Sequence, residues 1–201
     1  MAQPHAIPIY GFDNHFPVRV RPASRLNDDE LFELCQRNSE LRIERTSEGE
    51  IIVTSPTGGE TGRRNFLLTA ALAGWTAHDG IGFDSSTGFI LPNGAERAPD
   101  AAWLRRDRWE ALTLEQRRKF VPLCPDFVVE LRSPSDSLAE TQAKMDEYIA
   151  CGARLGWLID VDAKRAWIYR QGRAVETVEG ATTLAGEPEM AGLVIDLAAL
   201  E

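Results

Sequence analysis

The sequence predicts an α/β (α+β) domain in which helices flank a mixed central β-sheet. Short apolar runs, of the length that strands have, recur between turn signals along the 201 residues. Amphipathic stretches with capping residues lie between these runs and predict helices. From residue 126 a strand, a helix and a hairpin follow one another, and this order indicates a mixed sheet.

The first part of the chain is expected to contain an arm, two helices and a hairpin. Residues 1–25 are rich in proline and lack periodicity, which predicts an extended N-terminal arm before a single domain at 26–201. A helix is predicted over 27–39, where Asn27 or Asp28 can serve as the cap. A hairpin is predicted over 41–54, and a second helix over 60–78.

The second part is expected to alternate strands and helices. Its predicted elements are strands at 81–84, 88–92 and 97–104, a helical insertion at 106–120, a strand at 126–132, a helix at 137–151, a hairpin of 155–160 with 165–170, and an apolar tail at 189–201 that docks on the domain.

Composition limits the classes of function. The formal net charge of −9 argues against a protein that mainly coats nucleic acid, although an enzyme can act on nucleic acid through one local patch. The basic clusters at 105–108 and 117–119 are candidates for phosphate contacts. No apolar run has the length of a membrane span and no signal peptide is recognisable, so we expect a cytoplasmic protein. The three cysteines form no zinc motif and are expected to be free thiols.

Glu130 is the first candidate site residue, because it lies in an otherwise apolar strand, "DFVVELR". A buried carboxylate costs free energy unless it is paired or binds a cation. Two simpler explanations stay open: the strand emerges into solvent at this point, or Glu130 pairs with Arg132 on the same face.

A second carboxylate is needed for a metal site, and spacing selects Asp100. Asp126 lies four residues before Glu130 on the same strand, roughly 13 Å away, which is too far to share one ion. Asp100 belongs to another predicted strand and could meet Glu130 if the two strands are neighbours.

Lys144 and Tyr148 are four residues apart and share a face of the next helix. Lys144 is either a site amine or an ordinary solvated lysine.

These residues and their order resemble the Uma-two family, which is classed among the restriction endonucleases of the PD-(D/E)XK nuclease superfamily. The resemblance covers about residues 20 to 200 and rests on the Pro99-Asp100 pair, "PDFVVELRSPSD", "QAKMDEY", Gly152 and "LGWLIDVD". It implies a restriction-endonuclease-like core. It also implies that Asp100, Glu130 and the backbone carbonyl of Leu131 hold Mg²⁺ (or Mn²⁺), and that Lys144 is the catalytic amine.

The sequence departs from the superfamily pattern at one position. The superfamily places a lysine two residues after the glutamate, where this chain has Arg132, an arginine that does not release its proton. The resemblance places the lysine on the following helix instead, so either Lys144 or Arg132 faces the phosphate. Glu60 is a possible further carboxylate or an ordinary charge at a helix N-terminus, and Gln142 is a possible site neighbour.

The expected function is therefore that of a metal-dependent endonuclease that hydrolyses DNA phosphodiester bonds, for which a homodimer would suit cleavage of both strands. The alternative is a non-catalytic nucleic-acid-binding or regulatory protein that retains the nuclease fold, which the acidic pI favours. A carboxylate-pair hydrolase acting on sugars ranks last, because it leaves the Ser-Pro-Ser segment unexplained.

Overall fold

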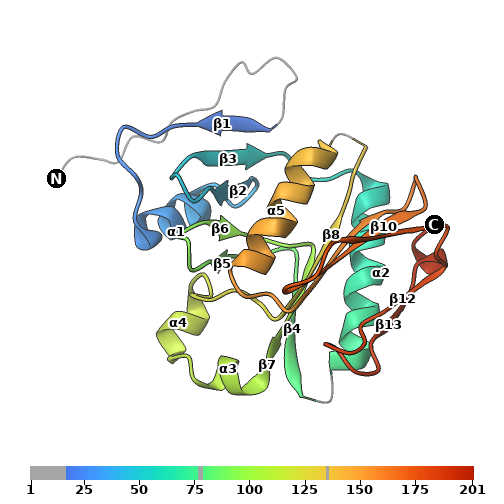
Figure 1. The fold of residues 1–201 in the computed structure, drawn as a ribbon. Coiled ribbons are helices and arrows are strands. Elements are labelled where there is room, and N and C mark those ends of the chain that lie inside the picture. Colours follow the sequence, from blue (N-terminus) through green and yellow to red (C-terminus); the bar gives the residue numbers. More distant parts are fainter. Residues whose placement is uncertain (1–16, 77–78, 135) are drawn as a thin grey trace.

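The computed structural model describes residues 17–76, 79–134 and 136–201 and contains a six-stranded mixed sheet (Figure 1). The strand order is β11-β10-β9-β8-β7-β4. The strands are β4 (Gly80–Asp84), β7 (Ala101–Arg105), β8 (Phe127–Leu131), β9 (Leu155–Asp160), β10 (Arg165–Arg170) and β11 (Glu176–Glu179). β8 and β9 run parallel and the other neighbours antiparallel, so the predicted mixed sheet is confirmed.

A second sheet has five strands in the order β1-β3-β2-β6-β5. Its strands are β1 (Val18–Val20), β2 (Arg42–Arg45), β3 (Ile51–Thr54), β5 (Phe89–Ile90) and β6 (Glu96–Arg97). β2 and β3 form the predicted hairpin. β1, which belongs to the expected arm, pairs with β3, while residues 1–16 of that arm lie outside the described residues.

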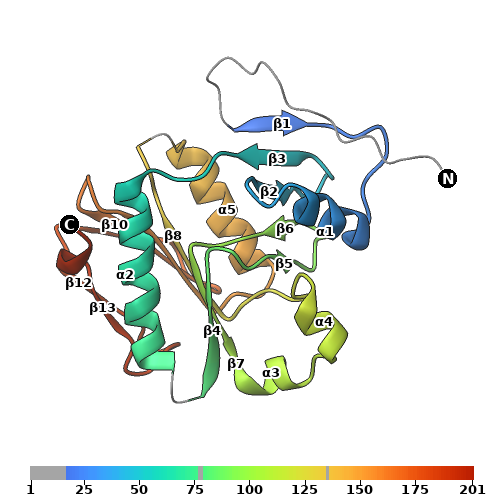
Figure 2. The same ribbon diagram turned by 180° about the vertical axis from the view of Figure 1, so that it is seen from behind.

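Helices α2 (Gly59–Thr76) and α5 (Leu138–Ala150) cover opposite faces of the six-stranded sheet (Figures 1 and 2). Successive side chains of β8 point to opposite faces. Phe127 and Val129 therefore pack in the core that contains Leu68 of α2, whereas Val128 packs in the core that contains Met145 of α5. Glu130 follows this alternation and faces α5.

The remaining elements surround these two layers. The helix α1 (Asp28–Arg37) begins at the predicted cap Asn27 and covers the second sheet with Leu31. The tail forms β12 (Thr183–Ala185), β13 (Val194–Asp196) and the 3-10 helix η1 (Ala198–Leu200). Leu193 and Ile195 are buried in the core beneath α2, so the predicted docking of the tail is confirmed.

Two predicted elements are divided in the structure. The expected helical insertion is two short helices, α3 (Arg106–Glu110) and α4 (Leu114–Arg118), because Thr113 caps a new helix by accepting from the Gln116 amide. The expected strand over 97–104 is interrupted between β6 and β7, where Pro99 has no N–H for a ladder. Asp100 therefore lies immediately before β7 and not within a strand.

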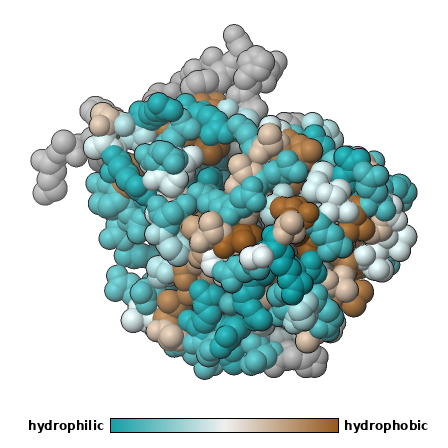
Figure 3. Space-filling view, in the orientation of Figure 1, coloured by the Kyte–Doolittle hydropathy of each residue, from teal (hydrophilic) through white to brown (hydrophobic). Residues whose placement is uncertain are grey.

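The face of the molecule in Figure 3 is largely hydrophilic, with apolar side chains in separate patches. Among the described residues, no helix combines the length and the apolar character needed to cross a bilayer.

Candidate active site

Asp100 and Glu130 lie opposite each other on neighbouring strands. β7 and β8 pair antiparallel with Ala101 opposite Val129, so one further step in the same register sets Asp100 against Glu130. The Leu131 amide donates a hydrogen bond to Asp100 Oδ2 at 2.8 Å, which fixes this register at the strand end. Both carboxylates are nearly buried, with 6% and 7% exposed surface. The structure therefore brings together the two acids that the sequence proposed.

Glu130 is held by two side chains of α5. The Tyr148 hydroxyl donates to Glu130 Oε1 at 3.1 Å, and Lys144 Nζ lies 2.9 Å from the same oxygen. Four residues separate these two partners, so both lie on the helix face that covers β8. Glu130 thus neither emerges into solvent nor pairs with Arg132.

Arg132 points to a different partner. Its guanidinium binds Asp160 Oδ2 at 2.5 Å and the Asp136 carbonyl at 3.2 Å. Arg132 does not line the cleft that contains Glu130, whereas Lys144 does.

Glu44 on β2 is a site residue that sequence reasoning missed. Its Oε1 lies 2.8 Å from Lys144 Nζ and accepts a hydrogen bond from the Ala98 amide at 3.0 Å. Arg97 Nη1 lies 3.3 Å from the other oxygen. Lys144 is therefore clamped between Glu44 and Glu130. Alternation in "RIER" indicates that Glu44 faces away from the Ile43 side, but not that this face lies against α5.

Asp100 has two further neighbours that the sequence did not indicate. Asn65 of α2 donates to Asp100 Oδ1 at 3.1 Å, and Arg42 Nη1 of β2 lies 3.6 Å from that oxygen. Arg42 and Glu44 are two residues apart on one strand and so present both side chains to the site. The proximity of Asp100, Glu130 and Glu44 raises the pKa of Arg42, although burial alone would lower it.

Two sequence candidates lie outside the cleft. Glu60 is exposed at the start of α2 and pairs with Arg63 at 2.7 Å and Arg64 at 3.5 Å, as an ordinary charge at a helix N-terminus does. Gln142 is half-buried on α5 and does not line the cleft.

The basic clusters of α3 and α4 also lie away from the cleft. Arg105 pairs with Asp107, Arg108 Nη1 lies 2.9 Å from Asp126, and Lys119 Nζ lies 2.9 Å from Asp29. These cations have intramolecular partners and none lines the cleft. They are therefore poorly placed to hold a phosphate beside Glu130.

The cleft has a volume of about 1040 Å³ and an acidic lining. Eight acids line it, against four cations. The acids are Glu44, Glu48, Glu96, Asp100, Glu130, Asp136, Glu140 and Glu147, and the cations are Arg19, Arg42, Arg97 and Lys144. A polyanionic ligand would therefore need an added positive charge to enter.

The buried charges shift one another's protonation equilibria. Burial raises the pKa of Glu130 to about 7, with Lys144 opposing the rise and Asp100 and Glu44 adding to it. Burial would lower the pKa of Lys144, but Glu130 and Glu44 together raise it, so the amine stays protonated at neutral pH. Burial opposes ionisation of Glu44, yet Lys144 and Arg97 lower its pKa to about 2.

Asp100 and Glu130 fit a hard divalent cation by donor type, since Mg²⁺ and Mn²⁺ prefer oxygen ligands. Tyr148 and Lys144 both contact Glu130 through Oε1, and Glu130 lines the cleft. Within 17–76, 79–134 and 136–201, no group of three or more His, Cys, Asp or Glu side chains is arranged to hold a metal. An ion would thus rely on two carboxylates, a backbone carbonyl such as that of Leu131, and water.

Comparison with known proteins identifies the family of the chain. Residues 28–198 match the model of the Uma2 family, described as "Putative restriction endonuclease". The chain belongs to the Uma2 family. The match includes the segment from Arg42 to Tyr148, and the resemblance to this family seen in the sequence is confirmed.

A solved structure shares the fold of this Uma2 protein. It is the crystal structure of a putative nuclease belonging to DUF820 from Anabaena variabilis ATCC 29413, with a TM-score of 0.70 and 18% sequence identity. The similarity covers 87% of this chain and 97% of that chain. No curated protein matches the sequence.

Proposed function

We propose that this Uma2 protein is a metal-dependent endonuclease that hydrolyses DNA phosphodiester bonds. The observation that carries the proposal is the constellation at the end of β7 and β8. Two nearly buried carboxylates, Asp100 and Glu130, lie opposite each other, and the Lys144 ammonium contacts one of them at 2.9 Å. Membership of the Uma2 family supports the same class of reaction.

Asp100, Glu130 and the Leu131 carbonyl would hold Mg²⁺ or Mn²⁺. Such a cation supplies Lewis-acid chemistry, lowering the pKa of water and neutralising charge on a phosphoryl group. Tyr148 and Lys144 both contact Oε1 of Glu130 and so fix the position of this carboxylate.

Lys144 acts as a fixed positive charge and hydrogen-bond donor. Its raised pKa means that it keeps its proton at neutral pH and does not serve as a general base. An ammonium at this position stabilises the negative charge that develops on the phosphoryl oxygens in the transition state. Glu44 also contacts Nζ, at 2.8 Å, which makes Glu44 a positioning residue.

Arg42 is the cation best placed to contact a phosphate. It lines the cleft, its side chain retains 35% exposure, and it lies 3.6 Å from Asp100. A cation at Asp100 would take over the neutralisation of that carboxylate, and the guanidinium would then be available to a phosphate oxygen. This charge balance accommodates DNA in a cleft whose lining is acidic.

The cellular location that we propose is the cytoplasm. All three cysteines, Cys35, Cys124 and Cys151, are free thiols, as is usual in a reducing compartment.

A cleavage screen tests the proposal. Plasmid, linear and branched DNA are incubated with the protein and Mg²⁺ or Mn²⁺, beside Glu130→Gln and Lys144→Ala. Glu33→Gln, which changes an exposed acid of α1 that pairs with Arg37 and does not line the cleft, is the matched control. We expect metal-dependent cleavage by the wild type and the control and none by Glu130→Gln. Cleavage that persists in EDTA, or in Glu130→Gln, would contradict the proposal.

A second candidate is a non-catalytic nucleic-acid-binding or regulatory protein that retains the fold. The observation in its favour is that Lys144 and Arg42 already neutralise Glu130 and Asp100 without an added ion. A thermal-shift titration separates the two candidates, because only the nuclease requires a rise in melting temperature with Mn²⁺ that Glu130→Gln abolishes. DNA binding without that rise would favour the second candidate.

A further inference from the structure

Strand β4 forms one edge of the six-stranded sheet, and among the described strands it pairs with β7 alone. The Arg106 amide donates to the Asp79 carbonyl at 3.2 Å, which makes Gly80 and Arg105 a non-hydrogen-bonded pair. In an antiparallel ladder such pairs alternate with hydrogen-bonded ones. Gly80 and Gly82 therefore direct their backbone N–H and C=O groups away from β7, toward the free side. Asp84 directs its N–H there as well, while its carbonyl accepts from the Thr87 amide at 3.2 Å.

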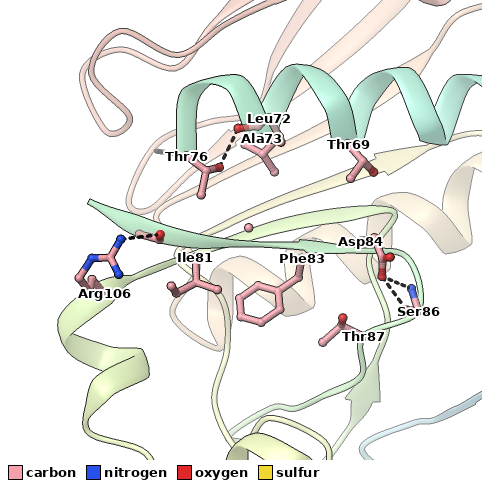
Figure 4. Close-up of a pocket in the computed structure, with 12 residues that line it drawn as sticks. Thr69, Leu72, Ala73, Thr76, Ile81, Phe83, Asp84, Ser86, Thr87 and Arg106 are labelled. Atoms are coloured by element: carbon pink, nitrogen blue, oxygen red, sulfur yellow. Dashed lines mark hydrogen bonds between the residues drawn. The ribbon is translucent and has the colours of Figure 1, made fainter. Parts of the chain in front are cut away.

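This free edge opens into a groove of about 760 Å³. In Figure 4, Thr69, Ala73 and Thr76 point from α2 toward the strand, and Ile81 and Phe83 lie on its other side. The sequence of β4, Gly-Ile-Gly-Phe-Asp, contains none of the lysines or prolines that commonly protect an exposed edge. Gly82 is exposed at the centre of the strand, so its outward backbone groups are accessible.

Asp84 and Arg106 mark the two ends of this edge (Figure 4). The Asp84 carboxylate accepts hydrogen bonds from the backbone and hydroxyl of Ser86, at 3.0 and 2.6 Å. The Arg106 guanidinium lies against the Gly80 carbonyl at 3.4 Å. Among the residues that the structure describes, neither charge has an oppositely charged partner. The neighbouring Arg105 and Arg108 both do, so Arg106 differs from its cluster.

We propose that this edge is a homodimer interface, in which β4 pairs antiparallel with β4 of a second copy about a two-fold axis through Gly82. Gly80 lies two residues before the axis and Asp84 two residues after it. An antiparallel copy therefore sets Gly80 opposite the partner's Asp84, and brings Arg106 to Asp84 of the partner subunit. The two-fold axis generates the same ion pair twice.

The charge pattern selects a second copy over another occupant. Asp84 lies two residues after Gly82, and Arg106 of α3 lies against the carbonyl of Gly80, two residues before it. The two unmatched charges thus have opposite sign and lie at opposite ends of the strand, which makes the edge complementary to itself. The small side chains of α2 that line the groove, Thr69, Ala73 and Thr76, let the two α2 helices approach across the axis. Position 82 also favours glycine, because a Cβ there would lie 3.2 Å from Thr76 Oγ1.

Sedimentation equilibrium of the full chain tests the interface through its charges. We expect the wild type to dimerise. Asp84→Arg and Arg106→Asp should each weaken the dimer by about tenfold or more, since each change places like charges opposite one another twice. The double variant Asp84→Arg/Arg106→Asp should recover the wild-type dissociation constant, because it restores both pairs with reversed sign. Thermal melting checks that each variant is folded.

The backbone ladder is tested by a matched pair at one position. Gly82→Pro removes the outward N–H at the centre of the proposed ladder but no hydrogen bond to β7. Gly82→Ala retains that N–H and, like the proline variant, adds a Cβ at this position. We expect a dimer for Gly82→Ala and a monomer for Gly82→Pro. A wild type that is monomeric at all concentrations, a double charge variant that stays weakened, or equal dimerisation of the two Gly82 variants would overturn the proposal. None of these measurements depends on nuclease activity.

Discussion

Lys144 Nζ lies 2.9 Å from Glu130 Oε1, and this contact joins the helix α5 to the end of the strand β8. The amine is 18% exposed and the carboxylate side chain 10% exposed, so the pair lies at the boundary between core and cleft. A pair in this position is shielded from bulk water yet can still meet a ligand. Removing Lys144 leaves the Glu130 carboxylate without its cation, whereas removing Glu130 leaves Lys144 paired with Glu44 at 2.8 Å.

Substitution of Lys144 should reduce the cleavage rate far more than substitution of a lysine outside the cleft. Lys144→Ala removes the fixed positive charge beside the proposed phosphoryl site, and we expect the cleavage rate to fall by about 100- to 1,000-fold. Single-turnover cleavage of plasmid with Mg²⁺ measures the loss. Lys119→Ala, which removes a lysine outside the cleft, is the control and should retain the wild-type rate. Equal rates for both variants would exclude Lys144 from the reaction.

Two variants distinguish whether Glu44 or Glu60 is the further carboxylate that contributes to the site. Glu44→Gln loosens the clamp on Lys144, and we expect cleavage to fall by about tenfold, as is common when a partner that orients a site group is removed. The acid limb of the pH–rate profile should also shift to lower pH, because the Glu44 charge contributes to the raised pKa of Glu130. Glu60→Gln should leave rate and profile unchanged. The opposite pattern would place Glu60, and not Glu44, in the site.

The pH dependence of stability should carry the signature of Glu130. Its pKa is raised from 4.5 in the unfolded chain to about 7 in the metal-free fold, chiefly by burial. A raised carboxyl pKa contributes stability that is fully present below pH 4.5 and is lost as pH rises through 7. Urea unfolding in EDTA should therefore show wild-type stability falling between these limits relative to Glu130→Gln, by about 3 kcal/mol.

Metal should reverse that pH trend. A divalent cation competes with the proton for the Glu130 carboxylate, so Mn²⁺ should raise the melting temperature more at pH 8 than at pH 6. The measurement is differential scanning fluorimetry at matched ionic strength, with Ca²⁺-free buffers. A stabilisation by Mn²⁺ that is the same at both pH values would contradict binding through Glu130.

The dimer interface should determine the products of plasmid cleavage. If two sites act on one duplex, the wild type produces linear plasmid with little nicked intermediate. Arg106→Asp weakens the proposed β4 interface without touching the cleft, so nicked plasmid should accumulate. The ratio of nicked to linear product over time is the readout, and the double charge variant with Asp84→Arg should restore the wild-type ratio.

A matched pair of glycines tests the packing at the edge of the sheet. A Cβ on Gly80 would lie 2.1 Å from Trp103 Cε2, a rigid buried ring, so we expect Gly80→Ala to lower the free energy of unfolding by about 1–3 kcal/mol. Gly74 lies inside α2 with nothing within 4 Å of its ideal Cβ. Gly74→Ala should instead raise the stability by about 0.5–1 kcal/mol. Denaturant titration of the two variants measures both changes.

The sequence by itself determined the local elements and the faces of the residues on them. Apolar periodicity gave β8, α5 and the hairpins, because each depends on spacing within a few residues. The same spacing placed Lys144 and Tyr148 on one helix face, and the structure sets both against Glu130. Asp126 was excluded as a partner by strand geometry, and it binds Arg108 instead.

Only the tertiary structure decided which elements meet. β2 lies against α5 through the packing of a second sheet, so Glu44 and Arg42 reach the site although they are distant in the chain. Arg132 turns to Asp160 because β8 and β9 are parallel neighbours, a pairing that local spacing does not encode. Alternation along a strand fixes the side to which a residue points. What lies on that side depends on the register and packing of segments far apart in the sequence.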